Sequence, residues 1–540
     1  MKVRSDIMKL SKSMHTWVGI TAGILLFICF FAGSLTMFQH QFSRWATPTQ
    51  QILPSVPVEK YNQLIEQVQQ QYPATQKSFT LNFNSNEFHY APITWSEKGR
   101  REGFNTQQQS WMASLNAQDQ LLAQQENLSK AGWLIEQLHE TAGIPGLLGH
   151  HTLGVYVMGM VSVLYFLALM SGLIILLPTL VKDYFAVRPG KNKKRFWLDT
   201  HNVVGITSLP FHIIICVSVV VFAFHDLIYD SFSSIAMKGK PVFPRNPPAL
   251  IEITQDKMDV AQIVQQVQKV APEYNIDFIQ FSNLDQPQKA NARIALYSPH
   301  HLLRGANQDF MRLNPYAVEH FDHSGINTQS SAGNTFINAL FSLHFGSYGG
   351  TPVRWMYVLL GLGGAFLFYS GNILWIETRS RKQKRAEDPQ PQQRKDVVFM
   401  ANLTIGSCLG CVIAIFASLL LCRWSFIFGG ISSLNHFFMY SYYAFFLCCI
   451  AYCFMRGYAK TLPEFFRLLS FILLMIPLTS LLAMLLPNFG LWSHRGDVLY
   501  IDVGCLIFSG LFYRFYQQAQ LRADKAKPGE LWSTASSEPV

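Results

Sequence analysis

Four histidines stand at matched positions in the two halves of the sequence. His15 opens the first long apolar segment in the run His15-Thr-Trp-Val-Gly19, and His201 opens the third in His201-Asn-Val-Val-Gly205. His139 and His344 each follow a leucine shortly before the second and fourth apolar segments. A histidine in or beside a membrane span is costly unless it has a partner, so such residues indicate a functional site.

The matched histidines belong to an internal duplication. A span, an outer segment and a second span describe residues 1–180 and again 196–380, with Ser171-Gly172 and Ser370-Gly371 at equivalent places. Both halves begin on the same side, so the repeat is parallel and implies a pseudo-two-fold axis along the membrane normal. This axis would pair His15 with His201 near the cytoplasmic surface and His139 with His344 near the outer surface. Two facing imidazoles suit the two axial positions of a haem iron.

A fifth histidine, His212, lies eleven residues after His201. On one continuous helix this is about 1100° of rotation and a rise of roughly 16 Å, nearly the same face but close to mid-membrane. His212 could replace one of the symmetric ligands or hydrogen-bond a haem propionate. Zinc is disfavoured because these histidines have no Cys, Asp or Glu at usable spacing. The chain has no C-x-x-C-H motif, so any haem would be of the non-covalent b type.

The elements that must hold these residues are membrane helices. Hydrophobic residues make up 49% of the chain and charged residues 14%, whereas soluble domains carry about 25% charged residues. A spanning helix needs about 20 mostly apolar residues. Eight segments qualify, namely 16–38, 152–177, 197–224, 353–376, 397–421, 432–455, 465–486 and 497–513. The sequence therefore predicts an α-helical polytopic membrane protein with about eight transmembrane helices.

The formal net charge of +10 reflects membrane topology and predicts no nucleic-acid partner, because the basic residues flank the apolar segments. The positive-inside rule places both termini in the cytoplasm of a bacterium and the protein in its inner membrane. Two long segments then face outside. Each contains a helical stretch followed by strand-like runs, which predicts two small periplasmic α+β domains.

The predicted domain organisation follows from these segments. It comprises a first span in 1–40, an outer domain in 41–149, spans two and three in 150–225, a second outer domain in 226–350, a fourth span in 351–380, a cytoplasmic linker in 381–396, a four-span region in 397–516 and a cytoplasmic tail in 517–540.

Three stretches of the chain resemble the PepSY-associated transmembrane family of iron-regulated membrane proteins. They are Ser13–Gly19, Val181–Gly190 together with Trp197–His212, and Leu343–Gly350, and the resemblance covers roughly residues 10–385. It implies two periplasmic PepSY-type domains and a four-span haem-binding core, and some members resemble siderophore reductases. His15, His139, His201, His212 and His344 fall on the family's histidine positions. Two departures stand out: Leu138–His151 is more apolar and carries an extra His150-His151 pair, and four C-terminal spans exceed the core.

These observations predict a membrane electron-transfer protein with two haem b groups. Electrons would come from a quinone or a cytoplasmic reductase, because no region is large enough for a flavin or nicotinamide domain of its own. They would pass to a ferric siderophore or another ferric chelate outside. The sequence identifies no catalytic residue beyond the haem ligands.

Two other functions compete with this one. A non-enzymatic PepSY-type protein that binds or regulates peptidases would use the histidines only for packing. A transporter is suggested by the eight spans and the repeat, but spans one to four contain no embedded Asp or Glu. Asp502 in the eighth span is the main exception, and polar contact between helices explains it as well.

Overall fold

The structure is a computed structural model of the 540-residue chain. It describes every residue except 1–2, 49–51, 85–88, 98–109, 127–130, 149–150, 185, 189–192, 237, 239–250, 302, 304–307, 327–331, 384, 386–388, 428–433 and 535–540. The chain divides into two compact units. The first comprises Met1–Thr49, Ser129–Ala223 and Trp355–Val540, and the second comprises Gln50–Leu128 and Phe224–Arg354.

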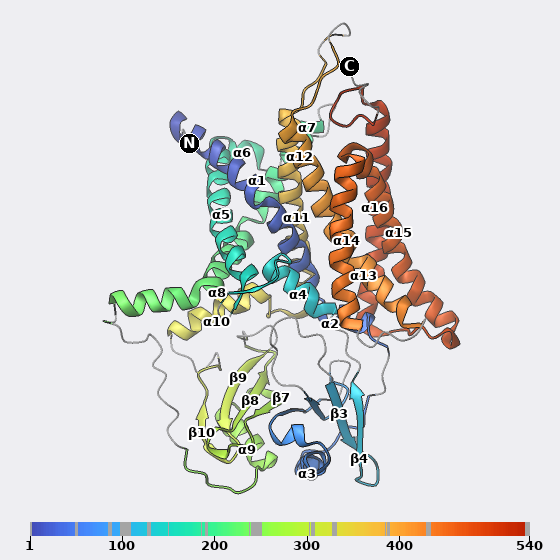
Figure 1. Ribbon diagram of the computed structural model, residues 1–540. Coiled ribbons are helices and arrows are strands. Elements are labelled where there is room, and N and C mark those ends of the chain that lie inside the picture. Colours follow the sequence, from blue (N-terminus) through green and yellow to red (C-terminus); the bar gives the residue numbers. More distant parts are fainter. Residues whose placement is uncertain are drawn as a thin grey trace. The chain divides into compact units, whose positions relative to one another are not determined.

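Eight helices in the described part are long and apolar enough to cross a membrane, as the sequence predicted. Their spans are Ser5–Thr36 (α1), Leu153–Lys182 (α5, η3 and α6), Leu209–Ala236 (α8), Gly350–Arg379 (α11), Lys395–Ser425 (α12 and α13), His436–Arg456 (in α14), Tyr458–Leu485 (α15) and Gly496–Lys525 (η8 and α16). A chain with this many apolar helices is a multi-pass membrane protein. Figure 1 shows the helices of the first unit, with α1 starting and α16 ending at the same end of that unit.

The third span differs from its predicted bounds, because the helix is interrupted. α7 (Lys193–Thr207) ends one residue before Ser208, and α8 (Leu209–Ala236) begins one residue after it. Pro210 explains the break: proline has no N–H to donate and its ring crowds the preceding turn. Ser208 lies at the break and donates its hydroxyl to the Val204 carbonyl at 2.6 Å. His201 and His212 therefore lie on two consecutive helices, whereas the sequence treated them as one.

Two short helices pack against the spans of the first unit. α2 (Gln39–Trp45) follows α1 directly, and α4 (Ala131–Thr141) lies against both α1 and α2. Gly132 permits this approach, because a Cβ there would lie 2.0 Å from the Gln39 carbonyl oxygen. Its amide also donates to the Ser43 hydroxyl at 3.0 Å. α4 is the helix that carries His139.

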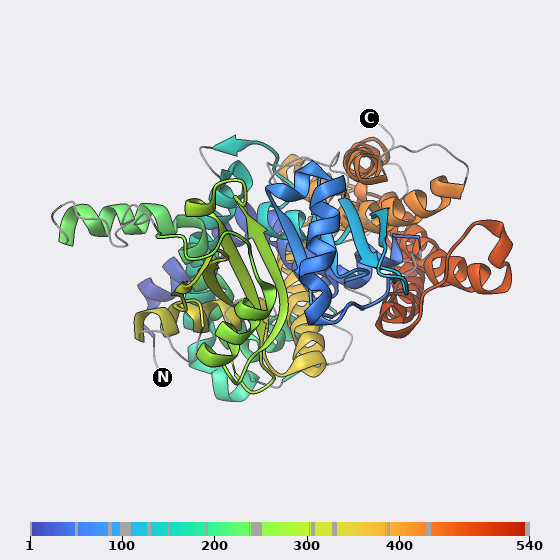
Figure 2. The same cartoon turned by 90° about the horizontal axis from the view of Figure 1, so that it is seen from below.

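The second unit contains one eight-stranded antiparallel sheet in the order β10-β9-β8-β7-β1-β2-β3-β4. Its strands are Phe79–Asn82 (β1), Ile93–Ser96 (β2), Ser110–Leu115 (β3), Leu121–Glu126 (β4), Asn275–Ser282 (β7), Asn291–Tyr297 (β8), Asp309–Asn314 (β9) and Ala317–Asp322 (β10). Helices α3 (Tyr61–Gln71) and α9 (Val260–Val270) pack against the sheet (Figure 2). The sequence predicted strands in both outer segments, but not that β1 and β7 would join them into one sheet.

Candidate functional site

His15 of α1 and His201 of α7 lie together in the first unit. Their ring centroids are 6.5 Å apart and the ring planes are nearly perpendicular, at 86°. His15 Nδ1 lies 2.9 Å from the Ala168 carbonyl oxygen of α5. His201 Nδ1 lies 3.0 Å from the Ser370 hydroxyl of α11. Each ring is thus anchored through Nδ1 by a different helix, which leaves Nε2 as the nitrogen that can bind a metal.

A glycine makes room beside each of these rings. A Cβ at Gly172 would lie 3.0 Å from His15 Cε1, and a Cβ at Gly371 would lie 3.5 Å from His201 Cε1. Both glycines directly follow the serines of the matched Ser-Gly pairs, Ser171 and Ser370. The two rings therefore sit in similar surroundings, each beside a small residue on a neighbouring span.

The spacing of the two rings would allow both imidazoles to bind one metal ion. A ligating nitrogen lies about 2 Å from its metal and about 1 Å from its own ring centre, so two axial imidazoles have centroids roughly 6 Å apart. The observed separation of 6.5 Å agrees with that value. The described residues contain no cluster of three or more His, Cys, Asp and Glu side chains suited to a metal ion.

His212 of α8 is a buried imidazole that lacks a hydrogen-bond partner. The residue is 0% exposed, and neither ring nitrogen has a partner among the described residues. Its neighbours are aromatic: the ring centroids of Phe211, Phe30 and Tyr165 lie 5.3, 5.4 and 5.9 Å away. Leaving a buried polar group unsatisfied costs about 1–3 kcal/mol. A ligand that accepts or shares a nitrogen lone pair would remove this cost.

His139 of α4 packs against the same stretch of α1 that touches His212. Its Nδ1 lies 2.9 Å from the Cys29 carbonyl oxygen. The ring covers Gly33, where a Cβ would lie 2.6 Å from Nδ1. Phe30, between these two positions, contacts His212. Burial lowers the pKa of His139, with the Cys29 carbonyl opposing the shift, so the neutral imidazole is favoured.

His344 belongs to the second unit. It lies near the end of α10 (Ala332–Phe345) and is half-buried, with its ring centroid 5.4 Å from that of Phe345. Its pairing with His139 therefore stays a prediction. His150 lies outside the described residues.

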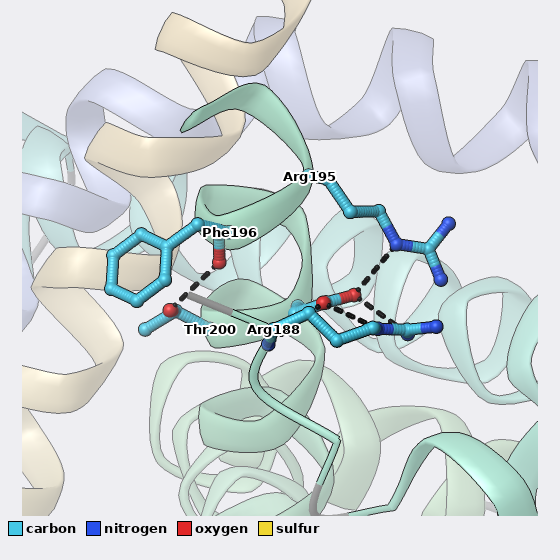
Figure 3. A network of polar contacts seen from close by, with 5 residues as sticks. Arg188, Arg195, Phe196 and Thr200 are labelled. Carbon is cyan, nitrogen blue, oxygen red and sulfur yellow. Dashed lines mark hydrogen bonds and ion pairs between the residues drawn. The ribbon is translucent and has the colours of Figure 1, made fainter. Parts of the chain in front are cut away.

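An acidic residue within α7, which sequence analysis did not single out, binds two arginines. The Asp199 side chain is only 2% exposed. Arg188 binds it through two nitrogens, with Nε 2.8 Å from Oδ2 and Nη2 3.0 Å from Oδ1, and Arg195 Nε lies 3.0 Å from Oδ1. Figure 3 shows both arginines reaching one carboxylate. Because Asp199 lies two residues before His201, this network holds the histidine's helix to the preceding loop.

A second buried polar cluster joins α2 to the C-terminal spans. The Asp502 carboxylate accepts hydrogen bonds from Trp45 Nε1 at 3.1 Å and from the Ser480 hydroxyl at 2.9 Å. Arg423 is fully buried, donates to Ser480 and to the Trp492 carbonyl, and lies 4.3 Å from the centre of the Trp45 ring. Asp502 thus makes the polar contact between helices that the sequence suggested for it, within a larger network.

The arrangement defines a polytopic membrane protein with a pair of half-buried histidines and one fully buried histidine among its N-terminal spans. The model of the PepSY-associated TM region matches residues 12–378, more than half of the 540-residue chain. The chain belongs to this family, which confirms the resemblance drawn from the sequence. The comparison with curated proteins gave no match.

Proposed function

We propose that this chain binds haem b non-covalently and carries electrons through the membrane to ferric chelates. The observation that carries the proposal is the His15–His201 pair, whose rings stand 6.5 Å apart with each Nδ1 hydrogen-bonded to a neighbouring helix. Ligating histidines usually donate their other N–H to an acceptor in this way. An ordinary packing pair would not need both anchors.

The residues divide into two candidate sites. His15 and His201 would hold one haem, and His212 would contribute to a second together with His139. When bound, haem supplies a one-electron couple, and its potential depends on burial and on the axial ligands. Ala168 and Ser370 orient the inner rings. Phe30, Phe211 and Tyr165 surround His212 and exclude water from it.

The direction of electron flow rests on the proposed topology of the inner membrane, with both termini in the cytoplasm. Electrons would enter from a quinone or a cytoplasmic donor and leave to a ferric siderophore or similar chelate outside. Hard oxygen ligands hold iron(III) more firmly than iron(II), so reduction would release the metal. A reporter fused after Asn283 should give a periplasmic signal, and a cytoplasmic signal would reverse this direction.

The deciding experiment is the visible spectrum of the full-length protein purified from haem-replete cells. We expect a reducible low-spin b-type spectrum with two haems per chain. His15→Ala and His201→Ala should each remove one and the same haem, and the double variant should lose no more, because one missing axial ligand already disables the site. His323→Ala, in an exposed position of the second unit, is the matched control.

The variants also assign the second site and separate the competing functions. Loss of one haem in the His212→Ala variant would show that His212 is a ligand. Whichever of His139→Ala and His344→Ala loses the same haem would identify the second ligand. A colourless preparation, with the variants indistinguishable from the parent, would overturn the proposal and favour the peptidase-binding function.

A further inference from the structure

A cavity of about 400 Å³ lies within the first unit, among segments far apart in the sequence. It is lined by the start of α7, the end of α11, the end of α16 and the segment that follows α16. Small-molecule sites commonly have volumes of about 300–1,000 Å³ and lie between helices of a bundle. The size of the cavity therefore fits a ligand of nucleotide size.

The cavity carries an excess of positive charge. Four cations line it, Lys194, Lys382, Arg522 and Lys525, against the two carboxylates of Glu377 and Glu530. Arg522 is paired with Glu377 at 2.5 Å. The structure shows no ion pair for the three lysines within the part of the chain that it describes. Three lysine ammonium groups are thus available to an anion.

Two tryptophans line the cavity, and one of them, Trp197, presents an exposed indole ring to it. The Trp532 side chain follows α16 and is 7% exposed, yet its indole N–H has no acceptor among the described residues. The Arg522 guanidinium lies 4.6 Å from the centre of this ring. Trp197 is 37% exposed and lies one helical turn before His201 on α7. A ring bound beside Trp197 would be separated from His201 by roughly 6 Å of helix rise.

Membrane topology alone accounts for only part of this arrangement. Lysines at the ends of spans follow the positive-inside rule, and tryptophans are common at the membrane surface. Neither tendency requires three distant segments to converge on one cavity. A ligand with an anionic group and a planar ring accounts for this convergence of cations and an exposed indole.

We propose that this cavity binds the electron donor, a phosphorylated carrier with a planar aromatic ring, for which flavin mononucleotide is the test compound. The lysines would bind the phosphate and the exposed Trp197 indole would contact the ring. This inference rests on the proposed function, because it is the position of His201 that makes the ligand a reductant. One reduced flavin loses two electrons and two protons, and two ferric ions outside each gain one electron.

Binding is measured first, on the purified full-length protein in zwitterionic nanodiscs, from the change in flavin fluorescence polarisation. Flavin mononucleotide should bind more tightly than riboflavin, which lacks the phosphate. The triple variant Lys194→Gln/Lys382→Gln/Lys525→Gln should weaken flavin mononucleotide binding at least about tenfold, because each charged hydrogen bond contributes about 1.5 kcal/mol or more. The matched control removes the same charge from three exposed lysines that do not line the cavity, Lys9, Lys12 and Lys460, and should leave the affinity unchanged.

The outcomes separate this inference from the proposed function. Equal weakening in both triple variants, or equal affinity for riboflavin, overturns the site. Nanodiscs with anionic phospholipid test the other source of phosphate: if they abolish binding in the parent, the cavity is a lipid-headgroup site and the inference fails. Binding by the His15→Ala/His201→Ala variant should be normal, since the cavity does not depend on haem. Normal flavin binding by a protein that never holds haem would support the ligand class while overturning the proposed function.

Discussion

Three glycines beside the candidate ligands provide a graded test of the site. A Cβ would lie 2.6 Å from His139 Nδ1 at Gly33, 3.0 Å from His15 Cε1 at Gly172, and 3.5 Å from His201 Cε1 at Gly371. Each Gly→Ala change adds one methyl group in the interior of a helix. The chemistry is therefore constant across the series, and only the clearance to the imidazole differs.

The expected effects follow from these distances. At Gly33 the methyl group must displace the His139 ring and break its bond to the Cys29 carbonyl. Loss of such a supporting bond lowers metal affinity about 10–100-fold. At Gly172 the His15 ring must move by a few tenths of an ångström, which stretches its hydrogen bond to the Ala168 carbonyl. If this costs half of a typical hydrogen bond, about 0.5 kcal/mol, haem affinity should fall roughly twofold. At Gly371 the contact is ordinary van der Waals contact, so the affinity should not change.

An effect of the substitutions on the helix backbone alone would be the same at all three positions. Alanine favours a helix over glycine by about 1 kcal/mol at every one of these positions, so unfolding temperatures should be unchanged or higher wherever the methyl group fits. The assay is haem titration of the apoprotein, with electron paramagnetic resonance to report the ligand field of each haem. Haem affinity should fall most for Gly33→Ala, slightly for Gly172→Ala and not at all for Gly371→Ala. Three equal affinities would refute the assignment of these histidines as ligands.

Three further predictions concern buried polar groups. Burial, together with nearby Arg423, lowers the pKa of His494 to about 4. As the pH drops from about 6.5 to 4, the unfolded chain therefore binds a proton before the folded chain does, and the free energy of unfolding should fall by at most about 3 kcal/mol. In chemical denaturation, the stability of the His494→Gln variant should lack this pH dependence. Arg423→Met leaves the buried Asp502 charge without its cation and should lower the free energy of unfolding by about 3 kcal/mol. The double variant Arg423→Met/Asp502→Asn should recover part of this loss, as measured by thermal unfolding. His212→Leu should stabilise the apoprotein by about 1–3 kcal/mol by removing unsatisfied nitrogens, while abolishing one haem in the loaded protein; a destabilised apoprotein would show that the imidazole has a partner.

Local sequence patterns predicted the parts of the molecule that depend on local composition. The eight spans follow from apolar runs of sufficient length, because a lipid environment requires a continuous helix. The meeting of His15 and His201 followed from their matched motifs, and their rings do lie together. Pro210 indicates a helix boundary before His212. The continuous apolar run around it nevertheless favoured a single helix.

Contacts between distant segments were beyond local patterns. Alternation along β1 and β7 indicates strands but does not specify which strand lies beside which. Their pairing, Thr80 opposite Gln280, is what joins the two outer segments into one sheet. The burial of Asp199 could not be predicted from the basic residues around it, because it depends on Arg188 in the preceding loop.

The two departures from the family pattern are physically connected in the structure. The end of the α4 helix and the turn after it fall in the unusually apolar stretch, and α4 contacts α14 (Leu434–Arg456) of the additional spans. Tyr443 of α14 donates its hydroxyl to the Gly143 carbonyl at 3.0 Å, and Gly143 has a φ of +78°, which favours glycine. A turn that packs against another helix gains by being apolar, since it buries surface that would otherwise face water or headgroups. The additional spans therefore pack against and support the helix that carries His139. This contact explains why a chain with the four C-terminal spans also has a more apolar segment after that helix.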